Sequence, residues 1–387
     1  MRILYFSTPP FADCDFPLVR EFQRMGHEVF YFIDLPPYFL RSTIIDIKNQ
    51  IQTNGIFLAS KYKEFETYKD YMSLENVYVI NRTQKSALHP RNIALYLKFL
   101  RIVNKINPDI INVVGGINEL SSFLLKFKRK LVLTVHDPFP HTGEQSLRRE
   151  FFRKLAMRNI PRFILLSEMQ KDEFVKKYKL RSEQVFNSCL GVYDCIYNFI
   201  KDVDDQDQPS KNILFFGRIS PYKGVEYLLE AMKLVHQKIP DATLTIAGGG
   251  KIYFDVASYQ NLPYIEIRNH YIGMEELAGL IARAQVVVCP YTDATQSGVI
   301  MTAYSLCKPV IATAVGGLAE MVDDGKSGLL VPPKNIEALA DAMYQVLSNN
   351  HMRETMKDYV SQYYIKGPKS WNMIANRYLN IYAVQDR

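Results

Sequence analysis

The stretch NILFFGRISPYKGVEYLLEAM, residues 212–232, decides the fold of this chain. Ile213–Phe216 is a continuous apolar run, which predicts a strand buried on both faces of a sheet. Beyond a short loop, apolar residues recur at helical spacing, at Val225, Leu228, Leu229, Met232 and Val235. The stretch therefore predicts a strand, a loop and a helix that begins at Gly224.

The loop of this stretch carries two cations, Arg218 and Lys223, beside the predicted start of the helix. A helix N-terminus offers unpaired N–H groups and a partial positive charge, so anions bind there. With a guanidinium and an ammonium added, the loop predicts a site for a diphosphate. A solvated loop with two ordinary surface cations is the alternative.

Residues 217–224 have the pattern G-R-x-x-x-x-K-G, and this segment resembles retaining glycosyltransferases of family 4. The match extends from Asn212 to about Val331. The resemblance implies an α/β GT-B fold, in which two Rossmann-like domains with parallel sheets face each other across a cleft. It also implies that Arg218 and Lys223, next to Gly217, hold the diphosphate of a nucleotide-sugar donor.

Size and composition agree with a globular protein of two domains. The chain has 387 residues, of which 48% are hydrophobic and 22% charged, with a net charge of +7. The charge suits anionic partners but does not by itself indicate nucleic acid. No run approaches the ~20 apolar residues of a membrane span, and MRILYFSTPP predicts a first strand rather than a signal peptide. Five scattered cysteines without CxxC spacing indicate reduced thiols in the cytoplasm and no metal site.

The polar segment DVDDQDQPSK, residues 202–211, predicts the domain boundary. We expect an acceptor-binding domain over 1–200, a linker over 201–211 and a nucleotide-sugar-binding domain over 212–365. By the resemblance, a C-terminal helix over 366–387 crosses back and packs on the first domain.

The N-terminal segment predicts a βαβ unit and hence a parallel sheet, with strand, helix and strand at Arg2–Ser7, Phe16–Met25 and His27–Ile33. The first loop, TPPFADCD, has two prolines and Phe11 where many enzymes of this fold have glycines. Its Asp13-Cys14-Asp15 is a literal D-x-D, a pattern that can bind a divalent metal. We expect instead that Asp15 caps the helix.

His136 and Asp137 follow the buried strand Leu131–Val135 at its carboxyl end, where ligands bind in open α/β sheets. His136 could contact a sugar hydroxyl or a developing charge, or could merely cap the strand end. The resemblance favours a contact with the donor sugar. Asp137, His141 and Glu144 are expected contacts to the acceptor.

The helix predicted near 147–162 is rich in arginine and lysine, with Phe151 and Phe152 interleaved. Such a helix can lie on an anionic membrane surface, and many relatives in the resembled family act on lipid-linked acceptors. The alternative is a helix with a solvated cationic face and a buried apolar face. We expect no nucleic-acid partner, because no recognition motif accompanies the charge.

Residues 290–317, PYTDATQSGVIMTAYSLCKPVIATAVGG, resemble the donor-binding segment of the same family. Backbone N–H groups at a predicted helix start should face phosphate, namely those of Ser297, Gly298 and Val299. The family's usual pair of glutamates is absent: Asp293 is nearest to the first, and Thr302 replaces the second, which commonly contacts the ribose. Thr302 can still form hydrogen bonds.

The tract Gly248-Gly249-Gly250 follows the predicted strand Ala242–Ala247. Glycines there could let the backbone approach the donor, and we expect Gly248 and Gly249 to contact it. A plain turn is the alternative, because the tract is not a GxGxxG fingerprint.

The resemblance implies a hexosyltransferase-type enzyme that moves a sugar from a nucleotide-diphosphate donor to a saccharide or lipid-linked acceptor with retention of configuration, in cell-surface polysaccharide or glycan biosynthesis. We expect no metal and no other cofactor, and a cytoplasmic location with peripheral contact to the inner face of the membrane. Two alternatives stay open. One is a nucleotide-sugar epimerase on the same fold, and the other is a non-catalytic binding or scaffold partner, which Thr302 and the missing glycine loop favour.

Overall fold

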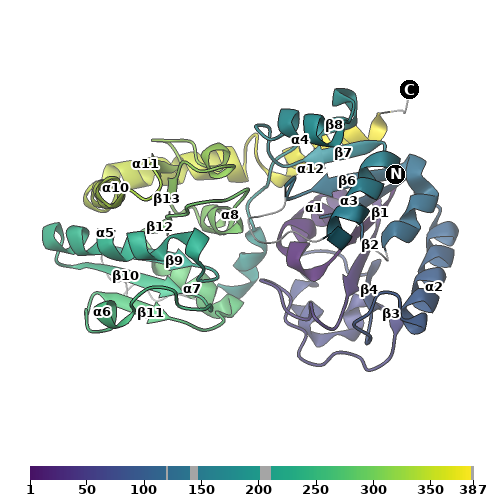
Figure 1. The fold of residues 1–387 in the computed structure, drawn as a ribbon, viewed down its shortest axis with the longest axis horizontal. Coiled ribbons are helices and arrows are strands. Elements are labelled where there is room, and N and C mark those ends of the chain that lie inside the picture. The colour runs from purple at the N-terminus through teal and green to yellow at the C-terminus, as the bar shows by residue number, and fades with distance from the viewer. Residues whose placement is uncertain (119–120, 140–146, 201–210, 385–387) are drawn as a thin grey trace. The chain divides into compact units, whose positions relative to one another are not determined.

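The computed structural model describes residues 1–118, 121–139, 147–200 and 211–384. The chain forms two compact units, one of residues 1–190 with 371–387 and the other of residues 191–370. Each unit is an open sheet with helices packed against it (Figure 1). The expected α/β architecture of two Rossmann-like units is confirmed.

The sheet of the first unit has eight strands in the order β3-β4-β2-β1-β5-β6-β7-β8. All neighbours are parallel except the edge strand β3, which is antiparallel to β4. This departs from a wholly parallel sheet, and antiparallel edge strands are common on otherwise parallel sheets. The strands span Arg2–Ser7 (β1), Glu28–Leu35 (β2), Gly55–Leu58 (β3), Val77–Asn81 (β4), Ile110–Val114 (β5), Leu131–Val135 (β6), Arg162–Leu165 (β7) and Val185–Asn187 (β8).

The helices of the first unit include the last helix of the chain. They span Ala12–Arg24 (α1), Pro90–Ile106 (α2), Leu147–Asn159 (α3), Lys171–Tyr178 (α4) and Trp371–Ala383 (α12). The aromatic rings of Tyr378 and Tyr382 on α12 lie 6.4 and 5.9 Å from the ring of Phe22 on α1. Arg162 of β7 donates a hydrogen bond of 3.0 Å to the Tyr382 carbonyl. The C-terminal helix therefore packs into the core of the first unit.

The sheet of the second unit has six parallel strands in the order β11-β10-β9-β12-β13-β14. The strands span Lys211–Phe216 (β9), Ala242–Ala247 (β10), Ile265–Arg268 (β11), Val286–Cys289 (β12), Val310–Thr313 (β13) and Gly328–Val331 (β14). The helices span Val225–Lys238 (α5), Ala257–Gln260 (α6), Met274–Arg283 (α7), Gly298–Ser305 (α8), Leu318–Met321 (α9), Ile336–Ser348 (α10) and Asn350–Val360 (α11).

Strand order locates the ligand-binding edge of each sheet. The order reverses between β9 and β12 in the second unit and between β1 and β5 in the first. Ligands of doubly wound sheets bind at such switch points, outside the carboxyl ends of the strands. The loops that follow these four strands are therefore where each unit is expected to bind ligands.

The first unit ends ten residues before the predicted boundary at residue 200. Residues 191–200 belong to the second unit because Tyr193 donates its N–H to the Met301 carbonyl at 3.2 Å and the Tyr197 hydroxyl donates to the Ser305 carbonyl. Cys195 and Ile196 are fully buried there. The polar composition near the linker does not reveal this packing.

The start of α1 corrects one local prediction. The helix begins at Ala12 instead of Phe16, and Phe11 occupies its N-cap position. Asp15 is 1% exposed and accepts hydrogen bonds from the hydroxyls of Tyr5 at 2.9 Å and Tyr31 at 3.2 Å. Asp15 is therefore not a helix cap, because its carboxylate is turned toward the strands β1 and β2.

Within the described ranges no helix is both long and apolar enough to cross a membrane.

Candidate functional site

The loop from β9 to α5 presents the two predicted cations. It begins at Gly217, with φ of +113°, and ends at Gly224, with φ of +64°. A Cβ at Gly224 would lie 2.0 Å from the carbonyl oxygen of Pro290, so only glycine fits where this loop meets the end of β12. A 3-10 turn over Pro221–Lys223 then places the lysine directly before α5.

The two cations have no anionic partner within the part of the chain that the structure describes. Arg218 is exposed, and neither its side chain nor that of Lys223 makes an ion pair with any residue that the structure describes. The Lys223 ammonium lies 3.6 Å from the ring centroid of Tyr291. Burial lowers the pKa of Lys223 to about 8; Cys289 opposes this effect, and the charge of Arg218 adds a smaller lowering. The loop thus holds uncompensated positive charge.

Tyr291 positions the lysine and joins two loops. Its ring is fully buried, and its hydroxyl lies 3.2 Å from the Ser297 hydroxyl. The next residue, Thr292, donates its N–H to the Tyr222 carbonyl at 2.8 Å. The β9–α5 loop and the β12–α8 loop therefore form one connected surface.

The start of α8 lies on this surface. A Cβ on Gly217 would meet the Val299 side chain at 3.5 Å. Ser297, the N-cap residue, makes no side-chain capping bond, because its hydroxyl is turned toward Tyr291. The first N–H groups of a helix have no partner within it, so those of Gly298 and Val299 add donors beside the cations.

Two glycines shape the other side of the β12–α8 loop. A Cβ on Gly316 or Gly317 would lie 1.9 Å from the carbonyl oxygen of Ala294 or Thr295, respectively. Only glycine permits this approach of the β13–α9 turn. Asp293, at the tip of the loop, is exposed.

Thr302 is buried on α8. It is 4% exposed, and its hydroxyl donates a 2.8 Å hydrogen bond to the Gly298 carbonyl within α8. The predicted ribose contact would have to use the remaining lone pairs of that oxygen.

The glycine tract after β10 has a packing role. A Cβ on Gly248 would lie 2.0 Å from the Gly217 carbonyl oxygen, and one on Gly250 would lie 2.1 Å from that of Ile219. The tract therefore packs directly on the backbone of the β9–α5 loop. This accounts for Gly248 and Gly250 without a ligand, and the predicted donor contact of Gly248 and Gly249 stays a prediction.

In the first unit, His136 lies at the end of β6 with 9% exposure. Its ring is 4.6 Å from the ring of Phe11, and its Nε2 is 3.7 Å from the Cys14 sulfur. Burial lowers the pKa of His136 to about 4, against the opposite effect of Asp137, so the imidazole is neutral at pH 7. Phe11 also covers Gly115, where a Cβ would be 2.4 Å from its ring. The missing glycine loop is thus replaced by an aromatic ring that packs on the ends of β5 and β6.

The carbonyl groups of Asp137 and Pro138 accept hydrogen bonds of 3.3 and 2.8 Å from Arg153 of α3. This basic residue therefore points inward and holds the loop after β6. The predicted acceptor residues His141 and Glu144 lie outside the described residues.

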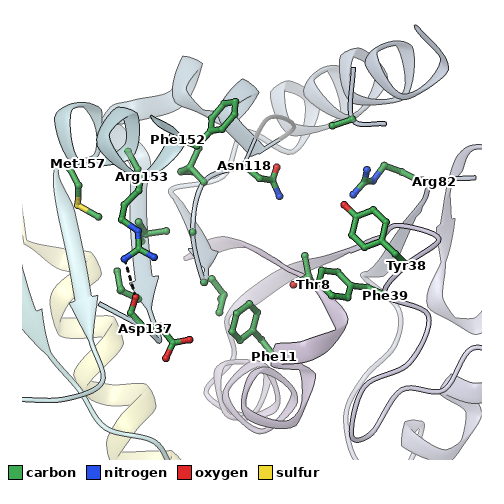
Figure 2. Close-up of a pocket in the computed structure, with 18 of the residues that line it drawn as sticks. Thr8, Phe11, Tyr38, Phe39, Arg82, Asn118, Asp137, Phe152, Arg153 and Met157 are labelled. Carbon is green, nitrogen blue, oxygen red and sulfur yellow. Dashed lines mark hydrogen bonds between the residues drawn. The ribbon is translucent and has the colours of Figure 1, made fainter. Parts of the chain in front are cut away.

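A pocket of about 630 Å³ opens beside these strand ends (Figure 2). Its volume is within the range of small-molecule sites, and all the described residues that line it belong to the first unit. Among the residues that the structure describes, Asp137 is the only predicted site residue in its lining. One other lining residue could have been predicted from the sequence. Arg82 directly follows β4, at the carboxyl end of a parallel strand, where ligands bind.

Two family models match the chain, one described as Glycosyltransferase Family 4 over residues 17–186 and one as Glycosyl transferases group 1 over residues 210–349. The chain belongs to this glycosyltransferase family. This chain also has the GT-B fold. The structure of HepE from Anabaena in complex with UDP and glucose matches it with a TM-score of 0.68 and 16% identity, over 98% of each chain.

Curated relatives are similar over part of their length. An uncharacterized glycosyltransferase from Methanocaldococcus jannaschii is 29% identical over 239 residues, which are 60% of this chain and 63% of the relative. The alpha-D-kanosaminyltransferase of Streptomyces kanamyceticus is 26% identical over 254 residues, 62% of each chain.

Proposed function

We propose that this family 4 member transfers a sugar from a nucleotide-diphosphate donor to a saccharide or lipid-linked acceptor with retention of configuration, in the assembly of a surface polysaccharide or glycan. The observation that carries the proposal is that two cations, Arg218 and Lys223, lie beside the N-terminus of α8 without an ion pair to any described residue. The UDP and glucose bound by HepE, which shares the fold, support a nucleotide-sugar donor.

The cations would act on the leaving group. Breaking the bond between the sugar and the diphosphate leaves negative charge on the diphosphate oxygens. Preorganised positive charge stabilises such developing charge more than it stabilises the bound donor. Arg218 and Lys223 supply this charge, so we propose that transfer requires no divalent metal and persists in a chelator. Neutral His136 is the proposed contact to the donor sugar.

Nucleotide binding tests the donor site directly. Thermal unfolding of the wild type is followed with UDP, GDP and ADP and their sugar conjugates. A rise in melting temperature with one nucleotide, lost in Lys223→Ala, supports the assignment. Lys238→Ala is the matched control, because it removes the same charge at the other end of α5, about 20 Å away. Equal nucleotide responses in both variants would refute the assignment.

A non-catalytic binding partner is the second candidate, favoured by two observations. Phe11 packs over His136, and the hydroxyl of Thr302 is engaged within α8. A protein of this kind binds the nucleotide-sugar but neither transfers nor hydrolyses the sugar. Product analysis by mass spectrometry with a panel of acceptors separates the two functions, and conversion of the donor without acceptor would instead reveal an epimerase.

We also propose peripheral contact with anionic membranes through α3. Phe151 is 62% exposed on this helix, and Lys154 and Arg158 are exposed with it. Ala156 and Met157 are buried, so contact would depend on these cations and one aromatic ring. Cosedimentation with anionic vesicles should fall in Lys154→Gln/Arg158→Gln, whereas binding to neutral vesicles should be weak in both proteins.

A further inference from the structure

A second pocket, of about 400 Å³, lies on one face of the sheet of the second unit. Its floor consists of Asn212 on β9 and of Thr243 and Thr245 on β10. Leu280 and Arg283 of α7 form one side. Thr243 is paired with Asn212 in the strand register, and alternate residues of a strand share a face, so the three polar side chains of the floor lie together.

This pocket lies away from the proposed donor site. Asn212 precedes Gly217 by five residues along β9, which places it roughly 16 Å from the β9–α5 loop in an extended strand. Arg268, at the end of β11, donates a 2.8 Å hydrogen bond to Glu276 in the first turn of α7. This ion pair joins β11 to α7 at the end of the pocket nearest the carboxyl ends of the strands.

The two threonine hydroxyls of the floor can act as donors to a ligand. The Asn212 amide donates hydrogen bonds of 3.1 and 3.3 Å to the hydroxyl oxygens of Thr243 and Thr245. Neither hydroxyl makes another hydrogen bond with a residue that the structure describes, so both hydroxyl protons are left for a ligand or for water. Asn212 and Thr245 are 8% and 5% exposed, so these donors belong to a buried and fixed floor.

Arg283 adds a positive charge to the same pocket. It is half-buried and makes no hydrogen bond or ion pair with any described residue. Glu266, the one carboxylate among the described lining residues, is already compensated, because it accepts hydrogen bonds of 2.8 and 3.2 Å from Arg268. Two hydroxyl donors and a guanidinium around one pocket favour an oxyanion over a neutral ligand. An arginine in the last turn also suits the negative end of a helix, but that role does not require the two hydroxyls.

The other walls require a ligand larger than a bare ion. Pro263 and Tyr264 line the pocket together with Leu280. The Tyr264 ring is held by stacking on His236, with 3.6 Å between the ring centroids. A pocket of about 400 Å³ exceeds the volume of a single phosphate or carboxylate, so a carbon skeleton has to fill the remainder. The mixture of apolar walls and hydrogen-bonding groups suits a skeleton that carries hydroxyls.

We propose that this pocket is a second ligand site, which binds a hydroxylated oxyanion of monosaccharide size. Its phosphate or carboxylate accepts hydrogen bonds from Arg283 and from the hydroxyls of Thr243 and Thr245, and its skeleton packs on Tyr264 and Leu280. The proposal goes beyond the proposed function and does not depend on it, because none of these residues belongs to the donor or acceptor site.

Isothermal titration calorimetry of the whole protein tests the ligand class. The probes are glucose 6-phosphate and glucuronate, which carry a phosphate and a carboxylate on a hydroxylated ring. Glucose has the ring without the anion, and inorganic phosphate has the anion without the ring. At least one of the two probes should bind about tenfold more tightly than either control, and the preferred probe identifies the oxyanion. Affinities of both probes no higher than that of glucose or of phosphate would overturn the proposal.

Variants locate the binding. Arg283→Gln breaks no described ion pair and should weaken the preferred probe at least about tenfold. Thr245→Val keeps the size of the side chain, loses one donor and should also weaken it. Lys326→Gln is the matched control, because it removes an exposed charge beside β14, at the opposite edge of the same sheet. Unchanged affinity in Arg283→Gln would refute the pocket as the site.

A crossed comparison separates this site from the donor site, which also attracts phosphate. Lys223→Ala should lose the nucleotide response and keep the binding of the preferred probe, whereas Arg283→Gln should do the reverse. Probe binding that is lost in Lys223→Ala and kept in Arg283→Gln would place the anion in the β9–α5 loop and refute the second site. A wild type that binds the probe but no nucleotide would refute the proposed function and leave this inference standing.

Discussion

Replacement of Lys223 by methionine should stabilise the ligand-free protein and abolish nucleotide binding. The ammonium is half-buried and makes no ion pair with a described residue. Lowering its pKa from 10.5 to about 8 corresponds to a cost of roughly 3 kcal/mol for the folded state at pH 7. Methionine has a similar length and no charge, so Lys223→Met removes this cost.

The gain is reduced by the contact with Tyr291. An ammonium over an aromatic face contributes up to about 2 kcal/mol when desolvated. The net gain is therefore about 1 kcal/mol, which corresponds to a rise of roughly 2–4 °C in melting temperature for a unit the size of residues 191–370. If Lys223 served only packing, Lys223→Met would lower the melting temperature instead of raising it.

The pH dependence supplies an independent check. Because the pKa of Lys223 is lower in the folded than in the unfolded state, its cost is fully present below pH 8 and disappears as the pH rises toward 10.5. The difference between Lys223→Met and the wild type should therefore shrink between pH 8 and pH 10. A bound diphosphate favours the charged lysine, so nucleotide affinity should fall as the pH rises through about 8.

Differential scanning calorimetry of both proteins from pH 7 to pH 10, with and without nucleotide, measures these effects together. The reasoning is refuted if Lys223→Met melts at a lower temperature than the wild type at pH 7 and still responds to nucleotide. Lys238→Met serves as the control. It should change the melting temperature by no more than a surface substitution does, and it should leave the response to nucleotide unchanged.

Three other variants test the packing that supports the sites. Burial raises the pKa of Asp15 to about 7, so the unfolding free energy should fall as the pH rises from 4 to 7, and Asp15→Asn should flatten part of that decline in urea titrations. Gly317→Ala forces a Cβ to 1.9 Å from a carbonyl oxygen and should lower the melting temperature by several degrees, whereas Gly273→Ala meets no atom within 4 Å and should change it little. Asp34→Asn leaves Arg82 unpaired and should cost about 3–5 kcal/mol in chemical denaturation, against about 0–1 kcal/mol for Asp46→Asn in an exposed pair; equal costs would contradict the buried pairing.

The second unit could be predicted largely from the sequence, because its signals are local. Ile213–Phe216 and the helical spacing after Gly224 indicate a strand, a turn and a helix from neighbouring residues alone. The placement of Arg218 and Lys223 follows from the same short stretch.

Only the tertiary structure decided the features that depend on residues far apart in the chain. The burial of Asp15 depends on Tyr31, 16 residues away, and the end of the first unit at Leu190 depends on contacts with Met301. Asp34 and Arg82 pair across 48 residues, and with Tyr38 they complete a pocket whose wall comes from α3. Local pattern shows which residues form strands and helices, whereas burial and pairing arise only once the sheet brings distant strand ends together.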